Sequence, residues 1–203
     1  MKAPEMTMTA PQPCEREHEF TLVLAGISEL TPAVEDALFK AGCDDATLAV
    51  RSGRVFVTFS RKSATIQQAI LSAIRDIRNA KIGADVLRID VCDLVTQADI
   101  ARRIDRTRQL VHQYILGTRG PGMFPPPACQ LADAAPLWYW CDVAHWLWEN
   151  NMISEQALRD VQVIDAINTV LELEHCRQAE PDLIQEVTRA LALPPSTGCG
   201  PVP

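Results

Sequence analysis

VTQADIARRIDRTRQLVHQYILG, residues 95–117, is the stretch that decides the fold of the middle of this chain. Thr96 is a residue type that caps helix N-termini, and a helix is predicted to follow it as far as Ile104. Thr107 holds the same position before a second helix, which is predicted to run to about Leu116. Two short helices are therefore expected in succession, with a tight turn between them.

The apolar residues of these two helices fall where the helices can touch each other. The predicted contact positions are Ile100, Ala101, Ile104, Val111 and Tyr114. Asp105 stands at the turn, and aspartate adopts the left-handed backbone conformation more readily than most residues. Two helices packed across a short turn in this way predict a helix-turn-helix, a motif whose second helix enters the major groove of DNA.

The packing positions also determine which residues of the second helix face outward. In the major groove arginine can bond guanine and glutamine can bond adenine, while threonine and the helix N-terminus can bind phosphate. The predicted DNA-binding residues are Thr96, Arg103, Arg106, Thr107, Arg108, Gln109, His112, Gln113 and Arg119. The alternative is a polar face that only meets water, but no acidic residue occurs between Arg106 and Arg119.

The segment after the two helices extends the pattern into a longer motif. The residues that carry it are Ile100, Ala101, Arg108, Gln109, Val111, Phe124, Pro125, Pro127, Trp140, Asp142, Val143, Trp146 and Leu147. Over about residues 94–148 the chain resembles the winged helix-turn-helix regulators of the excisionase, AlpA and MerR type. The resemblance implies a wing, formed by the prolines after Phe124 and the following aromatic strand, and a last helix that buttresses it.

The predicted wing departs from this family pattern at its tip. The tip, LADAAP at residues 131–136, has no arginine or lysine, whereas wings that hold phosphate usually carry one. Arg119, at the base of the wing, is therefore the better candidate for a phosphate contact. Trp138, Trp140 and Trp146 are expected to close the small core of this segment.

The preceding residues, 18–91, are predicted to fold as a domain of their own. Strand, helix, hairpin, helix and strand are expected in EFTLVLAG (19–26), LTPAVEDALFKAG (30–42), DATLAVRSGRVFVTFS (45–60), SATIQQAILSAIRDIRNAKIG (63–83) and ADVLRIDV (84–91). This β-α-β-β-α-β order is that of a ferredoxin-like, or split βαβ, domain. We expect it to sense a small-molecule effector or to bind a protein.

Residues 153–192 are predicted to be helical and to hold two copies of the chain together. The longer helix carries an apolar stripe formed by Ala157, Val161, Ile164, Ile167, Val170 and Leu171. A stripe of this length must be covered, so we predict a homodimer held largely by residues 154–176. A final helix should begin at Pro181, and residues 1–17 and 193–203 are expected to be flexible tails.

Charge is distributed unevenly along the chain. The formal net charge is −7, and residues 149–186 contain nine acidic side chains. Residues 95–117 differ, with four arginines against two aspartates. A local basic patch of this kind is sufficient for nucleic-acid binding, because counterion release depends on the phosphates contacted and not on the total charge.

Composition argues against several other classes of protein. With 47% hydrophobic and 22% charged residues the chain is expected to be globular. It has neither a long apolar run nor a signal-peptide core, so no membrane association and a cytoplasmic, nucleoid-associated location are expected. The seven cysteines lack C-x-x-C spacing, so neither a metal site nor a cofactor is expected. No catalytic motif occurs, which argues against an enzyme.

The sequence therefore predicts an α+β protein: a ferredoxin-like domain, a central winged helix-turn-helix and C-terminal helices. Its expected function is that of a bacterial-type, sequence-specific transcriptional regulator that binds double-stranded DNA as a homodimer. Two alternatives stay open. One is a protein-interaction or adaptor module that uses the helix-turn-helix only as a scaffold, and the other is an excisionase-like architectural protein that bends DNA.

Overall fold

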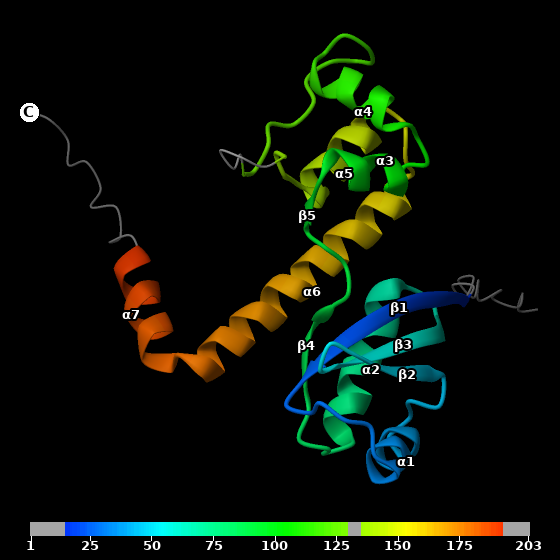
Figure 1. Ribbon diagram of the computed structural model, residues 1–203, viewed down its shortest axis with the longest axis vertical. Coiled ribbons are helices and arrows are strands. Elements are labelled where there is room, and N and C mark those ends of the chain that lie inside the picture. Colours follow the sequence, from blue (N-terminus) through cyan, green and yellow to red (C-terminus); the bar gives the residue numbers. More distant parts are fainter. Residues whose placement is uncertain (1–14, 130–134, 193–203) are drawn as a thin grey trace, which may run out of the picture.

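The computed structural model describes residues 15–129 and 135–192. It shows an α+β protein, as predicted: a four-stranded antiparallel sheet with helices in the N-terminal half, and a mostly helical C-terminal half (Figure 1). A long helix, α6 (Glu155–Ala179), runs down along the sheet domain from the segment drawn above it, which contains residues 94–149. None of the helices in the described residues is long and apolar enough to cross a membrane.

The sheet domain follows the predicted order of strands and helices. Its elements are β1 (Arg16–Ala25), α1 (Pro32–Lys40), β2 (Ala46–Arg51), β3 (Arg54–Ser63), α2 (Ile66–Asn79) and β4 (Asp85–Ile89). The strand order is β2-β3-β1-β4, and all neighbouring strands are antiparallel. Strands β1 and β2 are consecutive in the chain but do not pair with each other, because β3 lies between them in the sheet.

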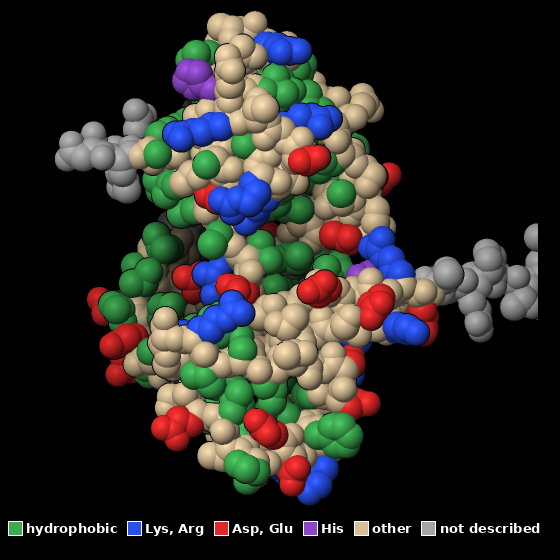
Figure 2. Space-filling view, turned by 45° about the vertical axis from the view of Figure 1, so that its right-hand side comes forward, with side chains coloured by type: hydrophobic (Ala, Val, Ile, Leu, Met, Phe, Trp, Pro, Cys, Tyr) green, Lys and Arg blue, Asp and Glu red, His purple; other side chains and the backbone are tan. Residues whose placement is uncertain are grey.

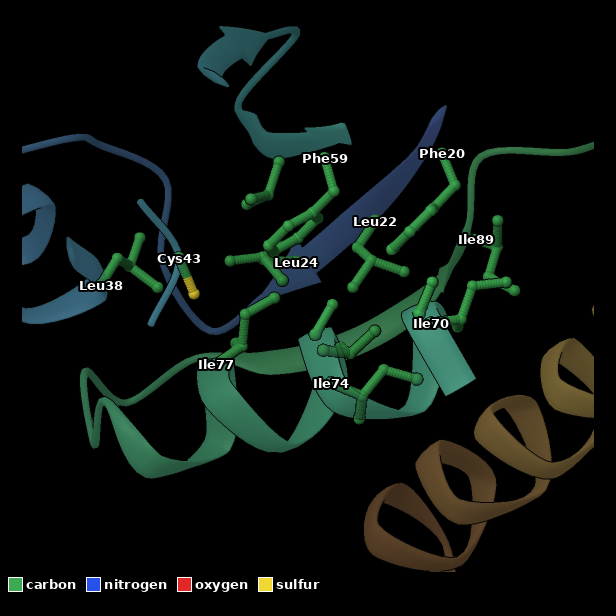
Figure 3. Packing of buried hydrophobic residues seen from close by; sticks show 14 of the residues in the cluster. Phe20, Leu22, Leu24, Leu38, Cys43, Phe59, Ile70, Ile74, Ile77 and Ile89 are labelled. Atoms are coloured by element: carbon green, nitrogen blue, oxygen red, sulfur yellow. The ribbon is translucent and has the colours of Figure 1, made fainter. Parts of the chain in front are cut away.

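Alternating apolar residues on the strands build one face of the sheet, and α2 covers it. Leu22 and Leu24 of β1 and Phe59 of β3 point toward Ile70 and Ile77 of α2 (Figure 3). All five of these side chains are fully buried. Because side chains on a strand alternate between the two faces, Leu22, Leu24 and Phe59 lie on the same side of the sheet.

Residue types that favour helix starts and tight turns occupy these positions in the sheet domain. The Thr31 side chain accepts a hydrogen bond from Val34 N at 3.3 Å and caps α1, while Pro32 occupies its first position. The β2–β3 hairpin turns at Ser52 and Gly53, which have φ angles of 50° and 74°. Two consecutive residues with positive φ are what a tight turn needs to match the twist of the strands.

The central segment contains β5 (Leu94–Val95), α3 (Gln97–Arg103), α4 (Arg108–Ile115), β6 (Trp138–Tyr139) and α5 (Trp140–Glu149). The expected wing is only partly seen. Cys129 and Leu137 form an isolated bridge, and the tip residues 130–134 lie outside the described residues. Trp138 and Tyr139, expected in the wing, instead pair with β5, a short strand before α3 that sequence reasoning missed.

Helix α6 (Glu155–Ala179) is used differently from the expectation. Ile164, Ile167 and Leu171, which belong to the stripe predicted to join two copies, pack against the core of the sheet domain in the same chain. Val170, from the same stripe, is 57% exposed. The core of residues 18–91 is thus completed by α6, and much of the stripe that led us to predict a homodimer through residues 154–176 is covered within one chain.

Candidate nucleic-acid interface

Helices α3 and α4 begin at the threonines predicted to cap them. The Thr96 hydroxyl accepts from Asp99 N at 3.2 Å, and Asp99 Oδ2 accepts from Thr96 N at 3.0 Å, which completes a reciprocal capping box. The Thr107 hydroxyl accepts from Leu110 N at 3.2 Å. Asp99 also accepts the Thr96 hydroxyl proton at 2.6 Å, whereas the Thr107 hydroxyl proton has no acceptor in the part of the chain that the structure describes.

Hydrogen bonding to Thr96 also affects the charge at the start of α3. The side-chain and backbone groups of Thr96 donate to the Asp99 carboxylate and lower the pKa of Asp99. The carboxylate is therefore ionised at neutral pH, and it pairs with Arg102 at 2.9 Å. Arg102 is one of the four arginines of this stretch, so one of them has an acidic partner.

The turn between α3 and α4 has the geometry predicted for it. Asp105 adopts a φ of 52°, in the left-handed region, and Arg106 N donates to Ala101 O at 2.9 Å. Gln97, which was not predicted to take part, donates from Nε2 to Arg108 O at 2.8 Å and ties the start of α3 to the start of α4. No local sequence signal marks Gln97, because the contact arises only where the two helices cross.

A compact apolar core holds the two helices against α5. Its buried members are Val95, Ile100, Ala101, Val111, Trp138, Val143, Trp146 and Leu147, and Ile104 and Tyr114 pack against them half-buried. All five predicted contact positions of the α3–α4 pair therefore lie in this core. The backbone of α4 is held on a packed support, and this rigidity is what a binding surface on its outer side requires.

The outer side of α4 carries the polar side chains predicted for it. Arg108, Gln109 and His112 are exposed, and Gln113 is half-buried. None of these four side chains makes a hydrogen bond or ion pair within the described residues. The Gln113 carbonyl accepts from the backbone amides of Thr118 and Arg119 at 3.0 and 3.3 Å, so the exposed Arg119 is held next to the end of this helix.

The structure does not bring all the predicted residues onto this surface. The Arg103 guanidinium lies over the Trp140 ring, 4.8 Å from its centroid, and donates to Cys92 O at 2.9 Å. Burial, the largest effect, lowers its pKa. Arg103 is therefore engaged on the side of α3 that faces the linker from the sheet domain. Arg106 is exposed and donates to the neighbouring Asp105 O at 3.0 Å.

Two tryptophans anchor the proline-rich loop that follows α4. Trp138 Nε1 donates to Pro125 O at 3.1 Å, and Trp146 Nε1 donates to Gly122 O at 2.8 Å. Gly120 has a φ of 85°, and a Cβ there would lie 2.8 Å from the Tyr114 ring, so this position requires glycine. The loop is fixed to the core and presents Arg119 beside α4.

The charged side chains are unevenly distributed over the face shown in Figure 2. Figure 2 shows basic side chains on the upper part of the molecule, which is the central segment, and most of the acidic side chains lower down.

Within the described residues, no group of three or more histidine, cysteine or acidic side chains could hold a metal ion. Burial, followed by the charge of Asp76, raises the pKa of the Cys43 thiol to about 11, which makes it a poor nucleophile.

The surface on α4 is thus a small set of unpaired polar side chains on a rigid helix, flanked by an arginine on an anchored loop. Its donors and acceptors match the edges of bases and the oxygens of phosphates. Comparison of the chain with protein-family models, with curated proteins and with solved structures found no match.

Proposed function

We propose that this chain is a sequence-specific transcriptional regulator that binds double-stranded DNA and reads a major groove with α4. In this proposal residues 94–148 act as a winged helix-turn-helix, and the ferredoxin-like domain of residues 18–91 receives a small-molecule or protein effector. The observation that carries the proposal is the outer face of α4, where Arg108, Gln109 and His112 are exposed and unpaired among the described residues.

The roles of individual residues follow from their partners. Arg108 and Gln109, at the start of α4, have the side chains that bond guanine and adenine edges, with His112 and Gln113 one turn further along. Thr107 and Arg119 are the candidates for phosphate contacts, because neither the hydroxyl proton of Thr107 nor the guanidinium of Arg119 has an acceptor among residues 15–129 and 135–192. Thr96 and Arg103 are assigned to the support of this surface, since other groups of the chain already occupy their side chains.

Arg108→Ala tests the proposal directly. We expect it to weaken binding to a selected DNA site by about 1–3 kcal/mol and to relax the preference at one base pair, because a bidentate contact to guanine is lost. The measurement is a mobility-shift titration on a site selected from a random DNA pool. Arg177→Ala, an exposed arginine near the end of α6, is the matched control and should leave the affinity unchanged.

A second candidate function is a protein-interaction module in which the α3–α4 pair is only a scaffold. The observation that favours it is the acidity of the chain, with a net charge of −7, together with the exposed aromatic rings of Tyr139 and Trp148. Salt dependence separates the two functions. DNA binding that falls steeply with rising salt supports the regulator, and absence of binding at low salt would favour the module. Strong bending of the bound DNA would favour the architectural variant.

A further inference from the structure

Helix α7 (Pro181–Leu191) presents an apolar face that nothing in the described chain covers. None of its residues is buried, and Leu183, Val187 and Leu191 are 53%, 43% and 75% exposed. These three recur every four residues, so they lie along one side of the helix. Figure 1 shows α7 turning away from the end of α6 and standing clear of the two domains.

A second uncovered apolar surface lies between α2 and α6. It is a groove of about 310 Å³ whose apolar walls are Leu71, Ile74, Val163, Ala166, Ile167, Val170 and Leu171. Leu71 and Val170 are 43% and 57% exposed on its sides. The ion pair of Arg78 with Glu174, at 2.6 Å, joins the two helices at one end. The groove thus has apolar walls and a polar end, as sites for amphipathic helices do.

The α7 helix of the same chain cannot reach this groove. One residue, Glu180, connects α6 to α7, and it ends the first helix and begins the second. Two antiparallel helices that pack side by side need a connection of about 2–5 residues. Helix α7 therefore cannot fold back along α6, and it can fill this groove only on another copy of the chain.

Charge favours the α7 helix of a second copy as that occupant. Glu186 of α7 flanks its apolar face, one turn from Leu183 and next to Val187. The α2 side of the groove carries Arg78 and, one helical turn before it, Arg75. Arg75 is exposed and pairs with no acidic side chain in the described residues. Because Arg78 already pairs with Glu174, Arg75 is the cation beside the groove that can meet Glu186 of α7, and both residues belong to every copy of the chain.

We propose that α7 of one copy packs into the α2–α6 groove of a second copy, and that the second copy returns the contact. Such an exchange uses the same two surfaces on both partners and closes as a two-fold symmetric dimer. It places the interface on α7 and on the exposed edge of α6, and leaves Ile164 and Leu171 in the intramolecular core. The inference does not depend on DNA binding, because it concerns the free protein.

Self-association of the full chain in the absence of DNA tests this inference. We expect light scattering at tens of micromolar to show a dimer, and Val187→Glu to raise the dimer dissociation constant by about tenfold or more. Val170→Glu, on the groove, should have the same effect. Gln185→Glu adds the same charge to the opposite side of α7 and should leave the dimer intact. Circular dichroism should be unchanged in all three, because these positions are exposed.

A mixing experiment identifies the exchange itself. Neither Val187→Glu nor Val170→Glu alone can form an intact contact, but a mixed pair retains one normal α7 facing one normal groove. Mixing equal amounts should therefore restore a dimer. Dimers of Val170→Glu that persist would instead indicate pairing between two α7 helices and overturn the proposal. A monomeric unmutated protein at tens of micromolar, or no restoration on mixing, would overturn it as well.

Discussion

At the scale of single residues, Arg61 is the residue that sequence reasoning did not single out. It is only 9% exposed and donates to Asp45 at 2.7 Å, to Asp76 at 2.7 Å and to Gly42 O at 2.8 Å. Its guanidinium also lies over the Phe59 ring. Hydrogen bonding to Asp45, the largest effect, raises its pKa further, so it is always charged. Arg61 thus links β3, α2 and the turn before β2.

Removal of Arg61 should destabilise the protein strongly. Arg61→Met leaves two carboxylates facing each other without their cation, and loss of one partner of a largely buried pair costs about 3 kcal/mol. Urea denaturation measures this loss. Lys62→Met, at the neighbouring exposed position of β3, is the control and should change the free energy of unfolding little. A loss for Arg61→Met as small as that of the control would show that water replaces the guanidinium.

The pKa of Asp165, on α6, leads to a second prediction at the scale of single residues. Burial, the largest effect, and the charges of Asp93 and Asp142 raise its pKa. The folded protein then holds this proton more tightly than the unfolded chain does, so stability falls as pH rises from the ordinary aspartate pKa, about 3.9, through the raised value. Asp165→Asn should therefore raise the melting temperature at neutral pH.

The gain from Asp165→Asn should shrink as the pH is lowered through the raised pKa toward the ordinary aspartate value of about 3.9, because the wild-type carboxyl becomes protonated first in the folded protein and then in the unfolded chain. Thermal melts across this pH range provide the measurement. Asp36→Asn, an exposed position on α1, is the control. A stabilisation that does not change with pH would assign the effect to packing of the amide instead of to the charge.

At the scale of secondary-structure elements, the two caps of the α3–α4 pair differ. Thr96 takes part in a reciprocal capping box with Asp99, whereas Thr107 makes a single capping bond to Leu110. Both helices are short, so a large share of their backbone donors lies in the first turn and depends on the cap. The stability of this pair therefore rests on its caps and on the core beneath it.

Thr96→Ala should destabilise the protein by about 1 kcal/mol, and Thr107→Ala by less, because the Thr96 hydroxyl makes two hydrogen bonds, from Asp99 N and to Asp99 Oδ2, whereas the Thr107 hydroxyl makes one, from Leu110 N. Urea denaturation of the two variants gives the comparison. Thr107→Ala should in addition weaken DNA binding in the proposed function, since it removes a hydroxyl proton beside Arg108 that has no acceptor within the described residues. Equal stability losses in the two variants would show that the bond from the Thr96 hydroxyl to Asp99 adds nothing measurable.

At the scale of the whole molecule, one buried amide joins α6 to the edge of the sheet. Asn168 is 5% exposed, and its Oδ1 accepts from Ile89 N at 2.8 Å. Its Nδ2 donates to Ile89 O at 3.5 Å and to Asp93 Oδ1 at 3.4 Å. Strand β4 is an edge strand, and Asn168 provides the acceptor for the Ile89 N–H at that edge, whereas Ile89 O also accepts from Val91 N at 2.7 Å.

Asn168→Leu should cost about 1–3 kcal/mol, because it leaves the buried amide of Ile89 unpaired. Hydrogen exchange at β4 and at the linker before β5 should accelerate, since docking of α6 is weakened at this point. Thr169→Ala, the exposed neighbour on α6, is the control. Unchanged exchange at Ile89 in the Asn168 variant would contradict the assigned role of the amide.

Within the candidate interface, the sequence predicted local features well and side-chain partners poorly. Spacing and capping residues were sufficient for the α3–α4 pair, its contact positions and the left-handed turn at Asp105, because each depends on neighbours in the chain. The engagement of Arg103 by Trp140 and Cys92 could not be predicted, since the partners lie far along the chain or on another element. The same reason explains why Gln97 was missed.

The sequence by itself determined the α+β class, the order of strands and helices in the sheet domain, the hairpin within residues 45–60 and the contact positions of the α3–α4 pair. These features follow from periodicity and turn chemistry, which act over a few residues. Only the tertiary structure decided what the apolar stripe of α6 covers, because an apolar helix face specifies burial and not a partner. In the structure, α6 packs on the sheet domain through Ile164, Ile167 and Asn168, and the apolar face of α7 is not covered by any described part of the chain.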